Sequence, residues 1–215
     1  MNNYQQHEQN SIWSDKAADD YVAEWGELPL HEKIPALCQI QPSNNVLDIG
    51  CGSGAAVRAI AKILTTGHVT GIDPTPRMIS LSNELTPSSL LNRTASFLLA
   101  SAEQIPLPNE SCDLIIAVNT LHHWRDIHQS LAEIDRILAP EGRFICIDDI
   151  WEDMPCHPVV GEMPVTLTEG YNLKSTKDIM KLLTDKSFQK LSCEFHREPD
   201  LSASIIISHK LKEKG

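Results

Sequence analysis

Short apolar runs alternate with helical patterns from residue 45 onward. Between the runs, apolar residues recur at helical spacing, as in the stretch that places Val57 and Ile60 on one face and Arg58 on the other. Alternating strands and helices predict a parallel sheet covered on both faces, an α/β fold of the doubly wound, Rossmann-like kind. The runs that have the length and composition of buried strands are 45–49, 68–73, 95–100, 113–118 and 143–148.

Local signals mark where helices begin and where the chain turns. Thr75 stands directly before a proline and predicts a helix N-cap, and Asp126 predicts another. The Pro-Glu-Gly sequence at 140–142 predicts a turn into the fifth strand. Ser175 and Asp178 have the spacing of a capping box, so we expect a late helix to begin there.

The two ends of the chain depart from the strand–helix alternation. Residues 1–43 carry aromatic and small residues at helical spacing, which predicts a helical extension or lid packed over the sheet edge. Late runs at 190–196 and 202–209 predict two strands that pair as an antiparallel edge of an otherwise mostly parallel sheet. The aromatic residues that could either line an acceptor pocket or form the packing face of such a lid are Trp13, Tyr21, Trp25 and Trp151.

We expect a single domain spanning 1–215. Within it, residues 44–150 are expected to form the cofactor-binding core, and 151–215 a substrate-side insert followed by the C-terminal strands. The chain shows no internal repeat or linker that would favour a second domain.

Charge and composition narrow the range of functions. The formal net charge is -11 and the basic residues are scattered, so a nucleic-acid partner is disfavoured. No apolar run approaches the roughly 18 residues of a membrane span. The N-terminus lacks the basic and apolar regions of a signal peptide, so a cytoplasmic location is expected. None of the six cysteines form a C-x-x-C pair, so no metal site is predicted.

The strongest chemical signal is the sequence VLDIGCGSG at 46–54. Glycines at alternate positions let the main chain turn tightly from strand to helix and approach a ligand closely. The spacing alone also satisfies the dinucleotide fingerprint G-x-G-x-x-A, so an NAD(P)-dependent oxidoreductase is an alternative. That alternative predicts a Tyr-x-x-x-Lys pair, yet no tyrosine of the chain has a lysine four residues on. A second acid, Asp73, ends the next strand, where a carboxylate can accept both ribose hydroxyl hydrogens.

Taken with four further segments, this loop resembles the class I S-adenosylmethionine-dependent methyltransferases. The similarity is greatest to the small-molecule branch that includes the ubiquinone and menaquinone C-methyltransferases. The order and spacing of the segments make the resemblance specific, and it covers roughly residues 45 to 150. The further segments are GIDPTPRMI at 71–79, SAEQIPLPNESCDLI at 101–115, NTLHHW at 119–124 and RILAPEGRFICID at 136–148.

The resemblance implies S-adenosylmethionine as cofactor and assigns a role to each matching residue. The glycine loop and Asp48 would hold the methionine moiety, and Asp73 the ribose. Ser101 stands where the family often has an acid, so its bond to adenine would lack charge assistance. The implied cofactor contacts are Asp48, Gly50, Cys51, Gly52, Asp73, Pro74, Met78, Ser101, Ala102, Glu103 and Asn119.

Three residues near the expected sulfonium are candidates for catalysis: Asn119, His122 and His123. A methyl group on a sulfonium is already a strong electrophile, so alignment of the acceptor can suffice. An oxygen or nitrogen acceptor can also need a base, and histidine titrates in the right range. A packing role for both histidines is the alternative.

The overall prediction is methyl transfer to a small acceptor, neutral or cationic, which the sequence does not identify. A protein that binds S-adenosylmethionine or S-adenosylhomocysteine without catalysis is the other alternative, because proximity catalysis requires no particular catalytic residue. Either a monomer or a homodimer is compatible with the sequence.

Overall fold

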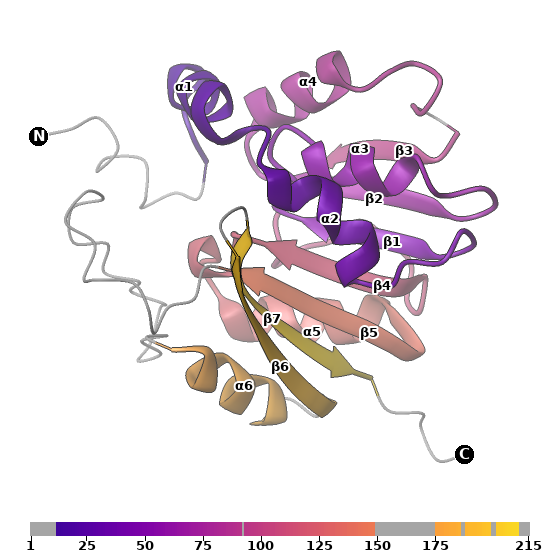
Figure 1. The fold of residues 1–215 in the computed structure, drawn as a ribbon, viewed down its shortest axis with the longest axis vertical. Coiled ribbons are helices and arrows are strands. Elements are labelled where there is room, and N and C mark those ends of the chain that lie inside the picture. Colours follow the sequence, from indigo (N-terminus) through magenta and orange to yellow (C-terminus); the bar gives the residue numbers. More distant parts are fainter. Residues whose placement is uncertain (1–11, 92, 149–174, 186–187, 199–200, 211–215) are drawn as a thin grey trace, which may run out of the picture.

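The computed structural model describes residues 12–91, 93–148, 175–185, 188–198 and 201–210. These residues form a seven-stranded sheet in the order β3-β2-β1-β4-β5-β7-β6, with helices on both faces (Figure 1). The strands are β1 (Asn45–Ile49), β2 (His68–Asp73), β3 (Ala95–Leu99), β4 (Cys112–Val118), β5 (Leu138–Asp148), β6 (Gln189–Glu198) and β7 (Leu201–His209).

The first five strands are all parallel. β1 pairs with β2 on one side and with β4 on the other, so the order of the strands reverses between β1 and β4. Open α/β sheets bind ligands outside the carboxyl ends of the strands at such a switch point. The predicted doubly wound, Rossmann-like α/β fold is confirmed.

The last two strands pair in the predicted antiparallel manner. β7 runs antiparallel to β5, and β6 runs antiparallel to β7. The later strand, β7, therefore lies inside the sheet, and β6 is the edge. The proline-containing link between them lies outside the described residues.

Two apolar cores lie on opposite faces of the sheet. One core buries Ile34 of α2 (Pro29–Leu37) and Ile60 of α3 (Ala55–Ala61). The other core buries Ile134 of α5 (Ile127–Ile137) and Leu182 of α6 (Thr176–Asp185). Burying one such side chain contributes roughly 1.5–3 kcal/mol, so these faces fix the helices to the sheet. The helices are α1 (Asp15–Trp25), α2 (Pro29–Leu37), α3 (Ala55–Ala61), α4 (Pro76–Leu85), α5 (Ile127–Ile137) and α6 (Thr176–Asp185).

Two of the predicted helix starts are confirmed in detail. The side chain of Asp126 accepts hydrogen bonds from the N–H groups of His128 and Gln129, both at 3.0 Å. The hydroxyl of Ser175 accepts the N–H of Asp178 at 3.3 Å and donates to its carboxylate at 3.0 Å. Satisfying these end groups stabilises α5 and α6 where they begin.

Thr75 is the N-cap of α4, as predicted, but its hydroxyl makes no capping bond and accepts the main-chain N–H of Trp13 at 3.2 Å instead. Two other local predictions were wrong because tertiary contacts override local preference. Residues 140–142 belong to strand β5, where Glu141 has a φ of 66°. Arg58 was predicted on the polar face of its helix, but it is buried. Its guanidinium donates to the carbonyl of Ser53 at 2.6 Å and pairs with Glu27, and these contacts satisfy the buried charge.

The N-terminal segment forms two helices where the spacing predicted one. Ala18, rather than an aromatic residue, is the buried position of α1, and Trp25 is 48% exposed.

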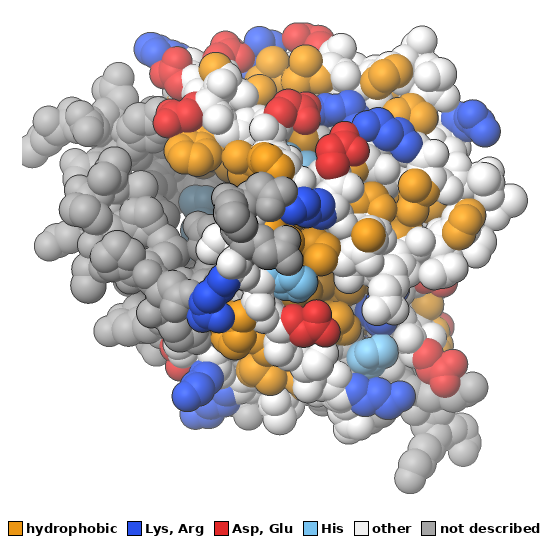
Figure 2. Space-filling model, viewed as in Figure 1, with side chains coloured by type: hydrophobic (Ala, Val, Ile, Leu, Met, Phe, Trp, Pro, Cys, Tyr) orange, Lys and Arg blue, Asp and Glu red, His pale blue; other side chains and the backbone are white. Residues whose placement is uncertain are grey.

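Among the described residues, no helix combines the length and apolar character needed to cross a membrane. Lys and Arg side chains are interspersed with Asp and Glu on the face shown in Figure 2, so no single-sign field covers it.

Candidate functional site

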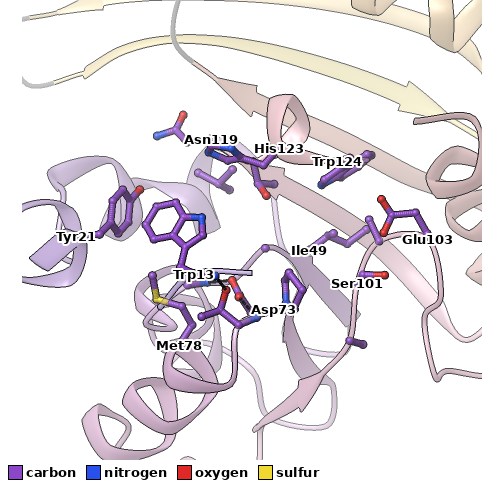
Figure 3. A pocket seen from close by; sticks show the side chains of 18 residues that line it. Trp13, Tyr21, Ile49, Asp73, Met78, Ser101, Glu103, Asn119, His123 and Trp124 are labelled. Atoms are coloured by element: carbon purple, nitrogen blue, oxygen red, sulfur yellow. Dashed lines mark hydrogen bonds between the residues drawn. The ribbon is translucent and has the colours of Figure 1, made fainter. Parts of the chain in front are cut away.

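A cleft lies at the carboxyl ends of β1, β2, β3 and β4, beside the point where the strand order reverses (Figure 3). Loops from these four neighbouring strands and the segment around α1 contribute its walls. The predicted site residues that line it are Gly50, Gly52, Asp73, Pro74, Met78, Ser101, Ala102, Glu103, Asn119 and His123.

The glycine-rich loop forms the floor of the cleft and depends on glycine at two positions. Gly50 has a φ of 73°, and a Cβ there would lie 2.1 Å from the hydroxyl oxygen of Thr120. Gly52 has a φ of 51°, and a Cβ there would meet nothing within 4 Å. The main chain at Gly52 therefore faces open space, where a ligand can approach it closely.

Four N–H groups of this loop already have acceptors within the protein. Those of Gly50 and Cys51 donate to the carbonyl of Ile72 at 2.8 and 2.9 Å. That of Gly52 donates to Asp73, and that of Gly54 donates to the carbonyl of Cys51. The loop thus offers a ligand its shape and its carbonyl groups rather than a nest of N–H donors.

Asp73 ends β2 and joins the glycine-rich loop to the start of α4. Its Oδ2 accepts the N–H of Gly52 at 3.1 Å, and its Oδ1 accepts the N–H of Thr75 at 2.8 Å. Burial raises the pKa of this carboxyl to about 6, although the hydrogen bonds from Thr75 and Gly52 oppose the rise. The Thr75 hydroxyl also donates to this carboxylate, whose two oxygens together still have capacity to accept a further hydrogen bond from a ligand.

Asp48 lies on β1, is 2% exposed and does not line the cleft. Its Oδ1 is buried and has no hydrogen-bond partner among the described residues. Burial, and secondly the charge of Asp73, raise the pKa of Asp48 to about 7. A buried carboxylate oxygen without a partner is costly unless a donor is supplied from elsewhere. Cys51 is also buried off the cleft, where desolvation raises the pKa of its thiol.

The opposite end of the cleft is formed by Ser101, Ala102 and Glu103. The Oε1 of Glu103 accepts the N–H groups of Arg125 and Asp126 at 2.9 and 3.2 Å. The carboxylate thereby holds the segment that leads into α5. Ser101 and Ala102, by contrast, present a short polar edge and a small apolar side chain to the cleft.

The segment after β4 brings the three catalytic candidates together. Asn119 adopts a φ of 50°, and its N–H donates to the carbonyl of Ile147 at 2.8 Å. His123 lines the cleft, whereas His122 does not; their ring centroids are 4.1 Å apart. The Nδ1 of His122 lies 3.2 Å from Oδ2 of the buried Asp148. Burial, assisted by His122, lowers the pKa of His123 to about 3, so that ring is neutral near pH 7.

Aromatic side chains form one wall. The rings of Trp13 and Tyr21 meet edge to face with centroids 4.9 Å apart, and Trp13 meets His123 in the same way at 6.1 Å. Both Trp13 and Tyr21 line the cleft, but Trp25 of the same segment does not. Trp151 lies outside the described residues.

Sequence reasoning did not select several small or apolar residues of the lining. They flank selected residues along the chain, and only the folded geometry shows which of them face the cleft. Thr120 is an example, because its side chain occupies the space that a side chain at Gly50 would need, a contact that exists only in the folded chain. These residues are Ile49, Thr75, Ala100, Val118, Thr120 and Trp124.

Comparison with known proteins identifies the class to which this fold and cleft belong. Residues 47–146 match the methyltransferase domain family. A crystal structure of an S-adenosylmethionine-dependent methyltransferase from Aquifex aeolicus superposes with a TM-score of 0.70, covering 93% of this chain and 100% of that one at 20% identity. The chain therefore resembles S-adenosylmethionine-dependent methyltransferases, in sequence over residues 47–146 and in fold over most of its length.

Two curated relatives show how much of the chain is similar in sequence to known methyltransferases. Methyltransferase GfsG of Streptomyces halstedii is 27% identical over 164 residues, which are 76% of this chain and 56% of the relative. Demethylmenaquinone methyltransferase of Symbiobacterium thermophilum is 27% identical over 143 residues, 62% of this chain and 56% of the relative. The chain therefore spans little more than half the length of these relatives.

Proposed function

We propose that the chain transfers the methyl group of S-adenosylmethionine to a small-molecule acceptor at the cleft. The observation that carries this proposal is a pair of acids at the glycine-rich loop: Asp73, which bonds Gly52 and lines the cleft, and Asp48, which is buried behind it. Asp48 has a buried oxygen without a partner, and Asp73 has lone pairs beyond its two main-chain bonds. A ligand with an ammonium group and ribose hydroxyls supplies the donors that such acceptors need.

The same loop disfavours a dinucleotide. A pyrophosphate needs N–H donors or cations, and the N–H groups from Gly50 to Gly52 already donate within the protein. The described lining of the cleft contains no Lys or Arg. S-adenosylmethionine carries no phosphate and requires neither. An oxidoreductase using NAD(P) is therefore the weaker alternative.

The resemblance to methyltransferases implies each cofactor contact that we propose. Asp48 accepts from the amino group, directly or through water, and Asp73 accepts from the ribose hydroxyls. Gly50, Cys51 and Gly52 border the methionine moiety with main-chain atoms. Pro74 and Met78 pack near the adenosine, Ser101, Ala102 and Glu103 border the adenine, and Asn119 faces the sulfonium. When bound, S-adenosylmethionine supplies an electrophilic methyl group.

The two histidines have different roles in this proposal. His123 is a neutral part of the cleft wall, because burial holds its pKa far below 7. His122 is the candidate base: it does not line the cleft, so a proton would reach it through a water molecule, and the carboxylate of Asp148, 3.2 Å from its Nδ1, would stabilise the protonated ring. Asn119 positions the reacting groups at the end of β4.

Parallel calorimetric titrations with S-adenosylmethionine, S-adenosylhomocysteine and NADH test the cofactor. We expect both sulfur nucleotides to bind and NADH not to bind; binding of NADH alone would overturn the proposal. Incubation with methyl-labelled donor and a set of acceptors then tests catalysis. Tight binding without transfer to any acceptor would favour a non-catalytic binding protein.

A further inference from the structure

We propose that the methyl acceptor is an amine whose nitrogen lies against the aromatic faces of Trp13 and Tyr21. The inference rests on the proposed function and specifies its substrate class. It follows from the geometry of the aromatic wall, from the charges along the cleft, and from the charge that methyl transfer places on the acceptor.

The aromatic wall is fixed from several sides. The Trp13 ring stands edge to face against both Tyr21 and His123, and all three line the cleft (Figure 3). The main-chain N–H of Trp13 donates to the hydroxyl of Thr75, which directly precedes α4. The carboxylate of Asp19 on α1 pairs with Arg77 of α4 at 2.8 Å. These contacts hold the aromatic faces beside the end of β4.

The charges along the cleft favour a cation over an anion. The described lining includes the carboxylates of Asp73 and Glu103 but no Lys or Arg, and His123 is neutral. The nearby cation of Arg77 is paired with Asp19 and with Glu84. A phosphate or carboxylate on the acceptor would find no counter-charge among these residues. An ammonium finds the negative faces of the aromatic rings, in a cleft whose described charged side chains are carboxylates.

The chemistry of methyl transfer to nitrogen fits this environment. An ammonium acceptor first loses a proton, to solvent or to His122, which leaves a lone pair on the nitrogen. That lone pair forms the new N–C bond, while the electron pair of the broken S–C bond remains on sulfur. The positive charge moves from sulfur to nitrogen, so the cleft stabilises a cation before and after the step. Aromatic faces do so without adding a competing nucleophile.

Binding of a matched pair of probes to the protein loaded with S-adenosylhomocysteine tests the inference. The probes are choline and its uncharged isostere 3,3-dimethylbutan-1-ol, compared by calorimetry. We expect choline to bind about tenfold more tightly, the range that a cation–π contact provides. Trp13→Leu should bring the two affinities close together, whereas Trp13→Phe should keep most of the difference. Trp25→Leu, at the end of the helix that follows Trp13 but off the cleft, is the control and should change neither affinity.

Each outcome separates this inference from the proposed function. Failure of the unmodified protein to bind S-adenosylhomocysteine would overturn the proposed function itself. Binding of S-adenosylhomocysteine with equal affinity for the two probes would overturn the amine inference alone. A Trp13→Leu variant that loses preference for S-adenosylmethionine over S-adenosylhomocysteine, but not for choline, would assign the aromatic wall to the sulfonium and also overturn it. Methylation of amines in preference to their hydroxyl analogues would support it.

Discussion

Oδ2 of Asp73 accepts the main-chain N–H of Gly52 at 3.1 Å, and this bond links the end of β2 to the loop that follows β1. The two strands are adjacent in the sheet but 21 residues apart along the chain at this contact. One carboxylate thereby both shapes the glycine-rich loop and faces the cleft above it. The loop conformation and the proposed ribose site depend on the same side chain.

Asp73→Ala is expected to weaken binding of S-adenosylmethionine by about a hundredfold, since two hydrogen bonds to a charged group are lost at roughly 1.5 kcal/mol or more each. The fold should persist, because β2 keeps its pairing with β1 and β3. Calorimetry measures the affinity, and urea denaturation measures the stability. Asp126→Ala is the matched control, because loss of the α5 cap costs about 1 kcal/mol without touching the cleft. Equal affinities in the two variants would remove Asp73 from the cofactor site.

Asp48→Asn is expected to change how stability depends on pH. The pKa of Asp48 is raised from its ordinary value of 3.8 to about 7, so between these values the unfolded carboxyl ionises while the folded one keeps its proton. The free energy of unfolding therefore falls as pH rises, by about 1.4 kcal/mol per pH unit for one proton. Asparagine does not titrate, so the variant should match the unmodified protein near pH 4 and be more stable at pH 8.

Urea denaturation of both proteins from pH 4 to pH 8, without cofactor, measures this difference. Subtracting the two curves cancels the titration of groups that the substitution does not affect. If the difference in the free energy of unfolding between the two proteins stays constant from pH 4 to pH 8, then the pKa of Asp48 is not raised in the folded state. If Asp48→Asn is more stable at pH 8 but binds S-adenosylmethionine more weakly, then the carboxylate that destabilises the fold when ionised is also needed to bind the cofactor.

The sheet could be predicted because burial imposes a simple pattern on its strands. The run at 114–118 is apolar throughout, and these residues of β4 are mostly buried, so the strand could be predicted without knowledge of its neighbours. The cap at Asp126 was equally local, since it involves residues two and three positions away. Arg58 shows the limit: its partner Glu27 is 31 residues distant, so helical spacing alone placed it wrongly in solvent.

The same distinction holds for the candidate site. Gly52 and Asp73 could be found because a motif fixes their positions relative to two strands. Two other features depend on contacts between distant segments. Asp48 lies behind the cleft with one carboxylate oxygen unpartnered, and His122 lies against Asp148 and does not line the cleft. A sequence reading cannot separate such residues from their neighbours in the same motif.

Asn119 combines a strained main chain with a side chain at the cleft, and a pair of substitutions separates the two. Its φ of 50° costs a residue such as alanine about 1 kcal/mol, whereas glycine adopts it freely. We expect Asn119→Ala and Asn119→Gly to lower turnover alike, by roughly tenfold for one lost polar contact. Alanine alone should reduce stability. Turnover retained by the glycine variant would show that the amide has no role, and equal losses of turnover and cofactor affinity would place it in cofactor binding.

His122→Gln is expected to reduce turnover of an amine acceptor by about a hundredfold near pH 7, the usual contribution of a general base. An ammonium in solution has a pKa near that of lysine, about 10.4. Raising the pH toward this value removes the proton without enzymatic help, so the deficit of the variant should shrink. Asp148→Asn should act in the same direction, because the bond between its carboxylate and Nδ1 of His122 stabilises the protonated ring. His128→Gln, on α5 and off the cleft, is the control. Identical pH profiles in the unmodified protein and in His122→Gln would mean that the proton leaves directly to water, and His122 would then have only a packing role.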